Sequence, residues 1–436
     1  MIDRTATARV QRLVRWLEQF KGCFGHRAQL LSLRSYVQGV FSDSDRKSMQ
    51  AMLARITEPV SYQAFQHFIT HAPWDADVVW RRLRALLPER RGVLILDGTS
   101  FPKQGPASVG VARQYCGALG KIANCQVATT VALWTGVRAW CLGARLYLPE
   151  TWLTPERRQP VRIPAAVRFQ EKWRHALALL RQVRAAGFEL TAVIGDAEFG
   201  DVTQLRTTLH RLALPYALGI SSTLTVFVHR PRLVPAITRA GRGRPRTARR
   251  VAETDRPLAV REVARRLPRS AWRWIRWRNG TQPSRRARFA ALRVTPATGW
   301  RVGRLAPEVW LLCEREPDGD LKYYLVHLPP GTALRRLVSL AHQRWAIEQQ
   351  YQELKSELGL DHFEGRTYPG WQHHVVLTAV AHAYIQRERM RRGAAGLTFP
   401  AVRAIVQEIF TALLFAAKPR YMHWMEQAKH KLQLRI

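Results

Sequence analysis

The chain has 436 residues, and its 69 Lys and Arg residues outnumber its 32 Asp and Glu residues to give a formal net charge of +37. A charge of that size, spread along the whole chain, predicts a polyanionic partner, with a generically basic soluble protein as the alternative. No uninterrupted apolar run approaches the roughly 18 residues of a membrane span, and no apolar signal segment follows the N-terminus, so we expect a soluble, cytoplasmic protein with no membrane partner.

The N-terminal part of the chain has helical periodicity. Residues 7–20 place aliphatic side chains on one face among arginines, and further helices are predicted over 49–56 and 62–70. Two short helices around a turn that contains Pro59 are typical of a helix-turn-helix that binds DNA, although an ordinary helical bundle explains the pattern equally well.

Two predicted strands of the next segment each end in an aspartate. Residues 93–96 are four aliphatic residues followed by Asp97, and residues 191–194 lead through a glycine to Asp196. Between them, residues 126–148 carry a strand-turn-strand pattern. A carboxylate at the end of a buried strand needs a cation to balance it. Because neighbouring strand ends meet at one edge of a sheet, we expect Asp97 and Asp196 to lie side by side.

Residues 223–320 are basic and rich in predicted β-structure. An Arg-Gly-Arg-Pro-Arg stretch contains Arg242, Arg244 and Arg246, which suit either a narrow minor groove or, as a solvated basic loop, the phosphates of DNA. Farther on, Trp274 belongs to a predicted β-hairpin. Packing in the core is the default for such a tryptophan, and stacking on an unpaired base is the functional alternative.

From Leu334 onward the spacing predicts one long helix. On this helix Arg344, Glu348 and Lys355 share one face, so that an acid is flanked by two cations. A surface ladder of salt bridges is the alternative. Two more helices are predicted over 375–385 and 401–417.

Three carboxylates on two strand ends and a helix form a hard-oxygen site of the kind that Mg²⁺ prefers. Two such ions about 4 Å apart promote phosphodiester displacement, and the basic charge indicates nucleic acid as the substrate. The Asp-Gly-Thr sequence at Asp97 is also found in phosphatases of the haloacid dehalogenase type. Those enzymes need a nucleophilic aspartate at the position that Ile95 occupies here, which argues against that chemistry.

With these residues in place, the chain resembles bacterial insertion-sequence transposases of the DDE superfamily, in the cut-and-paste branch with a β-strand insertion between the second acid and the glutamate. The resemblance covers nearly the whole chain and is carried by residues 94–103, 108–117, 195–201 and 344–355. It implies an α/β fold: an RNase H-like mixed-sheet catalytic core, interrupted by a β-rich insertion domain, with helical N- and C-terminal regions.

The resemblance also implies roles for individual residues. Asp97, Asp196 and Glu348 would be the catalytic, metal-binding triad for two Mg²⁺ ions, with Mn²⁺ as a substitute. The branch carries a Tyr-x₂-Arg-x₃-Glu-x₆-Lys signature, in which Arg344 and Lys355 would hold the phosphates of cleaved DNA ends. Ala341 stands at the tyrosine position, a departure that bears on any hairpin intermediate. Many relatives also carry an acid where this chain has glycine, directly after the first aspartate.

We therefore predict a Mg²⁺-dependent DNA transposase that cleaves and joins double-stranded DNA at transposon ends and target as a homodimer, in the bacterial cytoplasm on the nucleoid. The alternative is a non-catalytic DNA-binding protein or regulator derived from one. The expected organisation is a DNA-binding helical region, a first core segment, the insertion domain, a second core segment with the glutamate helix, and a C-terminal helical region, over residues 1–90, 91–222, 223–320, 321–392 and 393–436.

Overall fold

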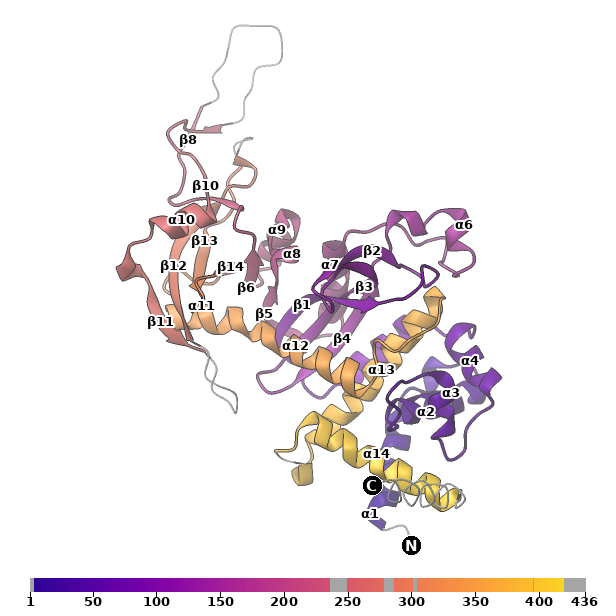
Figure 1. The fold of residues 1–436 in the computed structure, drawn as a ribbon. Coiled ribbons are helices and arrows are strands. Elements are labelled where there is room, and N and C mark those ends of the chain that lie inside the picture. The colour runs from indigo at the N-terminus through magenta and orange to yellow at the C-terminus, as the bar shows by residue number, and fades with distance from the viewer. Residues whose placement is uncertain (1–3, 236–248, 278–285, 301–303, 395, 419–436) are drawn as a thin grey trace, which may run out of the picture.

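The computed structural model describes residues 4–235, 249–277, 286–300, 304–394 and 396–418 (Figure 1). Its main feature is one large mixed sheet. The strands of the chain are β1 (Arg91–Pro102), β2 (Ala112–Cys116), β3 (Lys121–Trp134), β4 (Ala139–Leu146), β5 (Glu189–Gly195), β6 (Tyr216–Ile220), β7 (Thr225–Phe227), β8 (Leu233–Val234), β9 (Arg250–Val251), β10 (Leu258–Ala259), β11 (Arg273–Arg276), β12 (Arg286–Pro296), β13 (Val309–Arg315) and β14 (Leu321–His327).

The centre of this sheet has the RNase H-like strand order. The strands run β4-β3-β1-β5-β6, with β3 antiparallel to both β1 and β4 and with β5 and β6 added in parallel. β14, which begins the second core segment, pairs antiparallel with β6, and the insertion strands β13, β12, β7 and β10 follow outward, so the insertion continues the same sheet. The predicted α/β class and core topology are confirmed. The predicted β-rich insertion extends the sheet of the core.

Helices cover the sheet and build a separate bundle. They are α1 (Arg4–Glu18), α2 (Arg27–Val40), α3 (Met49–Ala54), α4 (Tyr62–Thr70), α5 (Ala76–Leu86), α6 (Pro155–Arg158), α7 (Lys172–Ala185), α8 (Ala197–Gly200), α9 (Thr203–Arg211), α10 (Val260–Arg266), α11 (Leu334–Ala341), α12 (Trp345–Gln352), α13 (Tyr368–Arg389) and α14 (Phe399–Ala417).

The two faces of β1 pack against different helices because side chains alternate along a strand. Leu94 and Leu96 belong to the large core that includes Leu180 of α7. Ile95 belongs to a second core with Ile347 of α12. Asp97, two residues after Ile95, therefore lies on the face that α11 and α12 cover (Figure 1). The alternation of side chains therefore directs Asp97 toward α12, the helix that carries Glu348.

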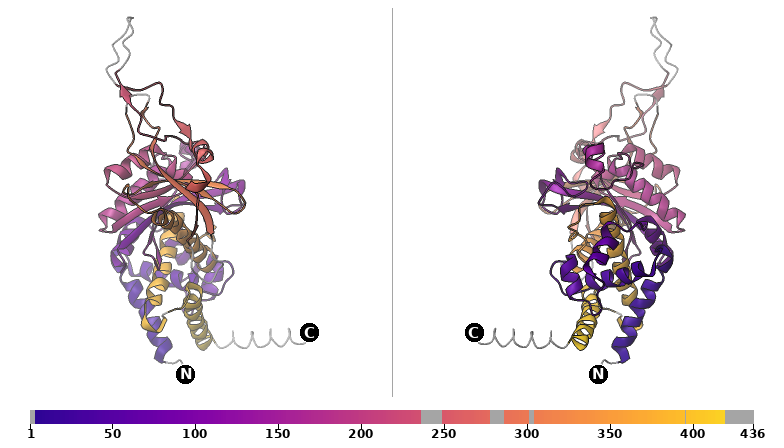
Figure 2. Two further views of the ribbon diagram at one scale, coloured as in Figure 1. Left: turned by 90° about the vertical axis from the view of Figure 1, so that its left-hand side faces the viewer. Right: turned by 90° about the vertical axis from the view of Figure 1, so that its right-hand side faces the viewer.

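The bundle lies at the opposite end of the molecule from the insertion (Figure 2). Its centre is α13, which contacts α2, α4 and α5 and is buried on all sides along much of its length. The two short helices of the predicted helix-turn-helix, α3 and α4, pack against each other and against α2. Ser61 begins α4 as expected, its hydroxyl accepting the Ala64 N–H at 3.1 Å.

In the described part of the chain, α14 is the one helix long and apolar enough to cross a membrane by length and composition. Its most apolar window has a mean hydropathy of 1.5, and 22% of that window is buried. The sequence search for an uninterrupted apolar run missed it because Arg403 and Glu408 interrupt the run. Arg403 also attaches α14 to the core, through an ion pair of 2.9 Å with Glu357.

The helix predicted from Leu334 is continuous from Leu334 to Glu357, but it is not α-helical throughout. The segment is α11, a 3₁₀ turn at His342–Arg344, α12, and a π-helical turn at Glu353–Glu357. A π turn holds more residues per turn than an α-helix, so Glu348 and Lys355 do not keep the alignment of one straight stripe. β2 is a further strand that was not predicted from the sequence.

Candidate active site

Asp97 and Asp196 lie at the same edge of the sheet. The parallel pairing of β1 with β5 ends at Ile95 and Ile194, and each aspartate comes two residues later, Asp97 within β1 and Asp196 directly after β5. Asp196 is also the N-cap of α8, where its side chain accepts the backbone N–H of Glu198 at 3.0 Å. The prediction that Asp97 ends its strand is wrong, because β1 continues to Pro102 and Asp97 pairs with Thr130 of β3.

Arg344 connects the strand acid to the helix acid. Its Nη1 donates to Asp97 Oδ1 at 2.9 Å, and its Nη2 lies 3.4 Å from Glu348 Oε1. The residue ends the 3₁₀ turn between α11 and α12, and its side chain lies beside Asp97 of β1. The cation that balances the buried Asp97 in this structure is therefore Arg344, which the resemblance had assigned to DNA phosphate.

The electrostatics of the site are those of crowded acids. Asp97 is 6% exposed. The pKa of Asp97 is raised to about 7, chiefly by burial, with the charges of Asp196 and Glu348 also raising it and Arg344 lowering it. Burial also raises the pKa of Asp196. For Arg344, burial lowers the pKa, but the three carboxylates outweigh it and leave the pKa raised. All three acids therefore act on one guanidinium.

Lys355 contacts the same strand farther along. Its Nζ donates to the backbone carbonyl of Ser100 at 2.9 Å and lies 5.2 Å from the centre of the Phe101 ring. Burial lowers the pKa of Lys355. Both cations of the signature thus lie beside β1. Arg344 contacts Asp97, and Lys355 contacts Ser100, three residues farther along the strand.

A buried anchor beneath the glutamate helix was not foreseen from the sequence. Glu353 begins the π turn, and its Oε2 accepts from His382 Nε2 at 2.9 Å and from Gln386 Nε2 at 3.0 Å, both on α13. The π turn follows directly on α12, which carries Glu348. In the sequence, Glu353 is a lone acid on an apolar helix face and His382 is a histidine in another apolar helix. Their pairing is visible only once the two helices are placed together.

Glu198 is a further acid at the site that the sequence analysis left without a role. It is held by Lys172 of α7, and a Cβ added to Gly98 would lie 3.2 Å from its Oε2. An acidic side chain at position 98 would thus meet Glu198. The glycine that departs from many relatives is the residue that leaves room for this carboxylate.

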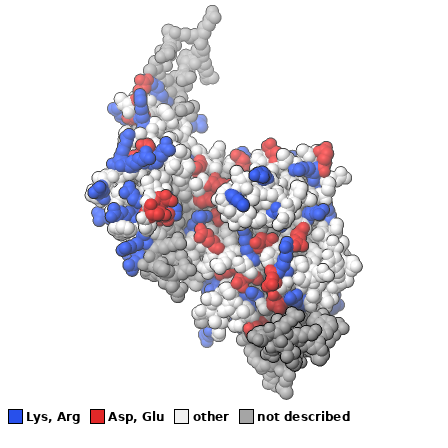
Figure 3. All heavy atoms as spheres, in the orientation of Figure 1, with Lys and Arg blue, Asp and Glu red and all other residues white. Residues whose placement is uncertain are grey.

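The predicted DNA-contacting residues of the insertion are only partly described. Trp274 is 54% exposed, so the core-packing alternative is wrong for this residue. The guanidinium carbons of Arg286 and Arg288 lie 5.3 Å and 5.0 Å from the centre of its ring. Lys and Arg side chains gather on the surface of the insertion, over α10, β11 and β12 (Figure 3). Arg242, Arg244 and Arg246 lie outside the described residues.

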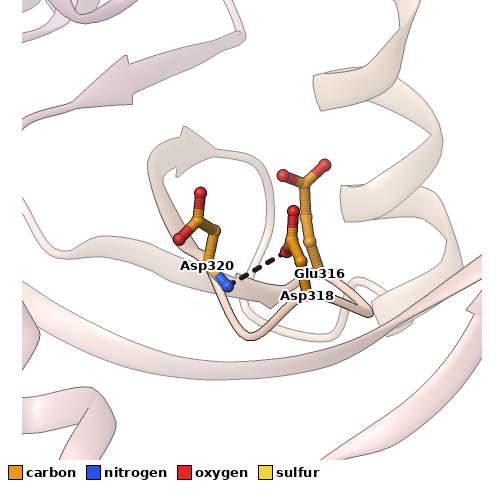
Figure 4. A group of neighbouring side chains, drawn as sticks. All are labelled: Glu316, Asp318 and Asp320. Carbon is orange, nitrogen blue, oxygen red and sulfur yellow. Dashed lines mark hydrogen bonds between the residues drawn. The ribbon is translucent and has the colours of Figure 1, made fainter.

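A second acidic group lies in the turn between β13 and β14. Glu316, Asp318 and Asp320 have carboxylate oxygens within 4.8 Å of one another (Figure 4). Their polar atoms are engaged in the turn: Asp318 accepts the Asp320 N–H at 3.2 Å, and Glu316 pairs with Lys322 at 2.8 Å. Gly319 completes the turn with a φ of +98°. This group is explained by turn formation.

Three comparisons place the chain among known proteins. A family model described as "DDE superfamily endonuclease" matches residues 19–284. The chain is 28% identical over 225 residues to the "Probable transposase for insertion sequence element IS701" of Microchaete diplosiphon, an alignment that covers 50% of this chain and 56% of the relative. The chain thus spans about half the length of that relative. A piggyBac transposase synaptic complex with hairpin DNA gives a TM-score of 0.44 at 9% identity over 91% of this chain and 73% of that chain, a likeness too low to support an argument.

The matched family range contains Asp97 and Asp196 and ends before Arg344, Glu348 and Lys355. The placement of those last three residues against β1 is therefore a finding of the geometry, independent of the family match.

Proposed function

Because this chain belongs to the DDE superfamily endonucleases, we propose that it is the transposase of an insertion sequence, which cuts DNA at the element's ends and joins those ends to target DNA. The observation that carries the proposal is the convergence of Asp97, Asp196 and Glu348 on Arg344, from β1, the residue after β5, and α12. Acids that are brought together from distant parts of a chain and partly buried are the arrangement that a metal-dependent nuclease requires.

The donor set suits divalent cations. The three side chains offer carboxylate oxygens, the ligands that Mg²⁺ prefers, and added positive charge would oppose the burial and the neighbouring acids that raise the pKa of Asp97. We propose Asp97, Asp196 and Glu348 as the residues that hold two Mg²⁺ ions, with Mn²⁺ as a substitute. The chemistry that bound ions supply at such a site is activation of the attacking oxygen and stabilisation of the leaving oxygen of a phosphodiester.

Arg344 and Lys355 have proposed roles toward DNA. Arg344 lies among the three acids and Lys355 lies farther along β1, and both already donate to oxygens of that strand. We propose that they bind phosphates beside the bond that is cut, where a guanidinium and an ammonium offer charge-assisted hydrogen bonds. Each would then exchange an oxygen of the protein for an oxygen of DNA.

The insertion is proposed as a second DNA-contacting surface. Trp274 presents an exposed ring next to two arginines, a combination that stacks on bases and binds phosphates. Trp274→Ala should weaken binding of DNA with unpaired bases by about 10-fold and leave the protein folded. Equal binding by the variant, measured by fluorescence anisotropy, would leave the tryptophan without this role. Arg242, Arg244 and Arg246 are proposed to contact phosphate or the minor groove.

The remaining expectations stay proposals for the whole protein. We propose double-stranded DNA as the partner, both transposon ends and target, a homodimer as the active assembly, and a cytoplasmic location on the nucleoid. The helical region 1–90 is proposed to bind DNA, and the division into 91–222, 223–320, 321–392 and 393–436 is proposed to separate core, insertion and C-terminal roles.

The proposal is tested with purified full-length protein and the DNA that flanks its own gene. Cleavage at the element ends should require Mg²⁺ or Mn²⁺ and stop when a chelator removes the metal. Asp196→Asn and Glu348→Gln should each abolish cleavage while DNA binding persists. Binding without cleavage by the wild-type protein at any metal concentration would instead identify a non-catalytic DNA-binding protein. Normal cleavage by either variant would remove that residue from the triad.

A further inference from the structure

The hairpin of β2 and β3 exposes three large apolar side chains. Tyr115 is 65% exposed, Ile122 62% and Leu119 49%. Tyr115 and Ile122 face each other across the two strands, and Leu119 lies in the turn between them. We call Tyr115, Leu119 and Ile122 the apolar tip. Apolar side chains grouped in this way on a charged protein indicate a binding surface.

The apolar tip is attached to the strand that carries the first acid. The backbone N–H of Ala118, in the turn, donates to Ser100 Oγ at 3.0 Å, and Cys116 Sγ lies 3.4 Å from the same hydroxyl. The carbonyl of Ser100 accepts the bond from Lys355. One residue, three positions beyond Asp97, thus contacts both the hairpin and a cation of the glutamate helix, so the tip flanks the acid cluster.

The charge on the hairpin favours a polyanion. Residues 112–122, which form β2, the turn and the start of β3, contain two basic residues, Arg113 and Lys121, and no acidic one. Arg113 and Lys121 lie on the hairpin itself, are exposed, and frame the apolar side chains. A partner that offers apolar surface between negative charges fits this pattern, and the bases and phosphates of DNA do so.

We propose that the apolar tip packs against bases displaced from the duplex next to the phosphodiester that is cut, with Tyr115 stacking on a base and Leu119 and Ile122 wedging the adjacent step. Arg113 and Lys121 bind the flanking phosphates. The inference rests on the proposed function, because it places the tip beside the DNA that the acids process. It adds a role for the hairpin in opening that DNA.

The test compares a tip variant with a matched surface variant. The tip variant carries Tyr115→Ser, Leu119→Ser and Ile122→Ser, all at exposed positions. The control is Val137→Ser, at a residue that is 68% exposed in the turn at the other end of β3. Both variants should unfold close to the wild-type midpoint, because surface substitutions cost little stability.

Base opening is read by 2-aminopurine placed at successive positions across the element end. The wild-type protein and the Val137→Ser variant should raise its fluorescence at the opened positions, and the tip variant should not. The tip variant should also cut fully paired DNA about 10-fold more slowly and recover to within about twofold of wild type on DNA with mismatched pairs at those positions.

Three outcomes would overturn the inference. The first is unchanged cleavage and fluorescence in the tip variant. The second is equal slowing on paired and mismatched DNA, which would mean that the tip does not act by opening bases. The third is an intact fluorescence response with an altered sedimentation coefficient, which would assign the tip to a protein contact. If the wild-type protein cuts no DNA, the proposed function fails, and the fluorescence response of wild type against the tip variant still decides this inference.

Discussion

The sheet carries two groups of three carboxylates, and they differ in what brings the acids together. In the turn between β13 and β14, the acids come from one short segment, and their oxygens accept bonds from that segment and from Lys322. Around Arg344, the acids come from three separate elements: Asp97 from β1, Asp196 from the residue after β5, and Glu348 from α12. The short distances between carboxylates favour the turn as a metal site. Convergence from distant segments, burial and a raised pKa favour the group around Arg344, and they are the stronger indication of function.

The largest expected effect compares the two groups directly. Asp97→Asn should slow metal-dependent DNA cleavage about 1,000-fold or more, because a lost ligand removes several kcal/mol of transition-state stabilisation. Asp318→Asn should stay within about twofold of wild type, since its carboxylate serves the turn. Initial cleavage rates at saturating DNA measure both. Equal losses in the two variants would mean that the turn group belongs to the active site.

The next effect separates two glutamates on one helical segment. The Glu353 side chain is 7% exposed and paired with His382, whereas the Glu348 side chain is 66% exposed. Glu353→Ala should cost about 3 kcal/mol in the free energy of unfolding, because it leaves buried donors without an acceptor. Glu348→Ala should cost within about 0.5 kcal/mol and still abolish cleavage.

Urea unfolding measures the first quantity and the cleavage assay the second. The reverse pattern, a stable Glu353→Ala and an unstable Glu348→Ala, would exchange the structural and chemical roles that the geometry assigns to them.

Local patterns in the sequence were sufficient for much of the fold. The predicted bounds of α4 match the structure to the residue, because hydrophobic periodicity and capping signals act over short distances. Asp97 and Asp196 were found for the same reason. β2 was missed because its side chains alternate between partial and full exposure among glycines, and little of it is buried.

Hydrophobic periodicity does not predict the 3₁₀ turn and the π turn within the helix that carries Glu348. The 3₁₀ turn aims Arg344 at Asp97, 247 positions away in sequence. The π turn lets Glu353 reach α13. Both are adjustments of local geometry to contacts between distant segments, so only the assembled fold specifies them. The same contact identified the counter-cation of Asp97, which the sequence could not.

A third effect tests a buried titratable side chain that serves packing. His374 on α13 bonds through Nδ1 to the Tyr36 hydroxyl at 2.7 Å and through Nε2 to the Leu360 carbonyl at 3.0 Å. Burial lowers its pKa to about 4, against an ordinary value of 6.5. Between pH 4 and pH 6.5, His374 therefore binds a proton in the unfolded state and remains neutral in the folded state. Stability is complete above pH 6.5 and is lost as the pH falls toward 4.

The expected contribution of His374 over that window is on the order of 2 kcal/mol. His374→Gln should remove that part of the slope of unfolding free energy against pH, whereas His67→Gln, at an exposed position of α4, should keep the wild-type slope. Urea unfolding at pH 4.5 and pH 7 measures the change in unfolding free energy between these two pH values. An unchanged slope in His374→Gln would show that the folded protein accepts this proton.

The smallest effect returns to the turn acids. Gly319 has a φ of +98°, and a Cβ added there would meet no atom within 4 Å, so a substitution is opposed by backbone conformation alone. Gly319→Ala should cost about 1 kcal/mol of stability, and Gly319→Asn less, because asparagine tolerates positive φ better. Both variants should cleave DNA at the wild-type rate. If Gly319→Ala slowed cleavage more than its loss of stability explains, the geometry of Glu316, Asp318 and Asp320 would matter to the chemistry. The turn acids would then belong to the active site, and the distinction between the two acidic groups would be wrong.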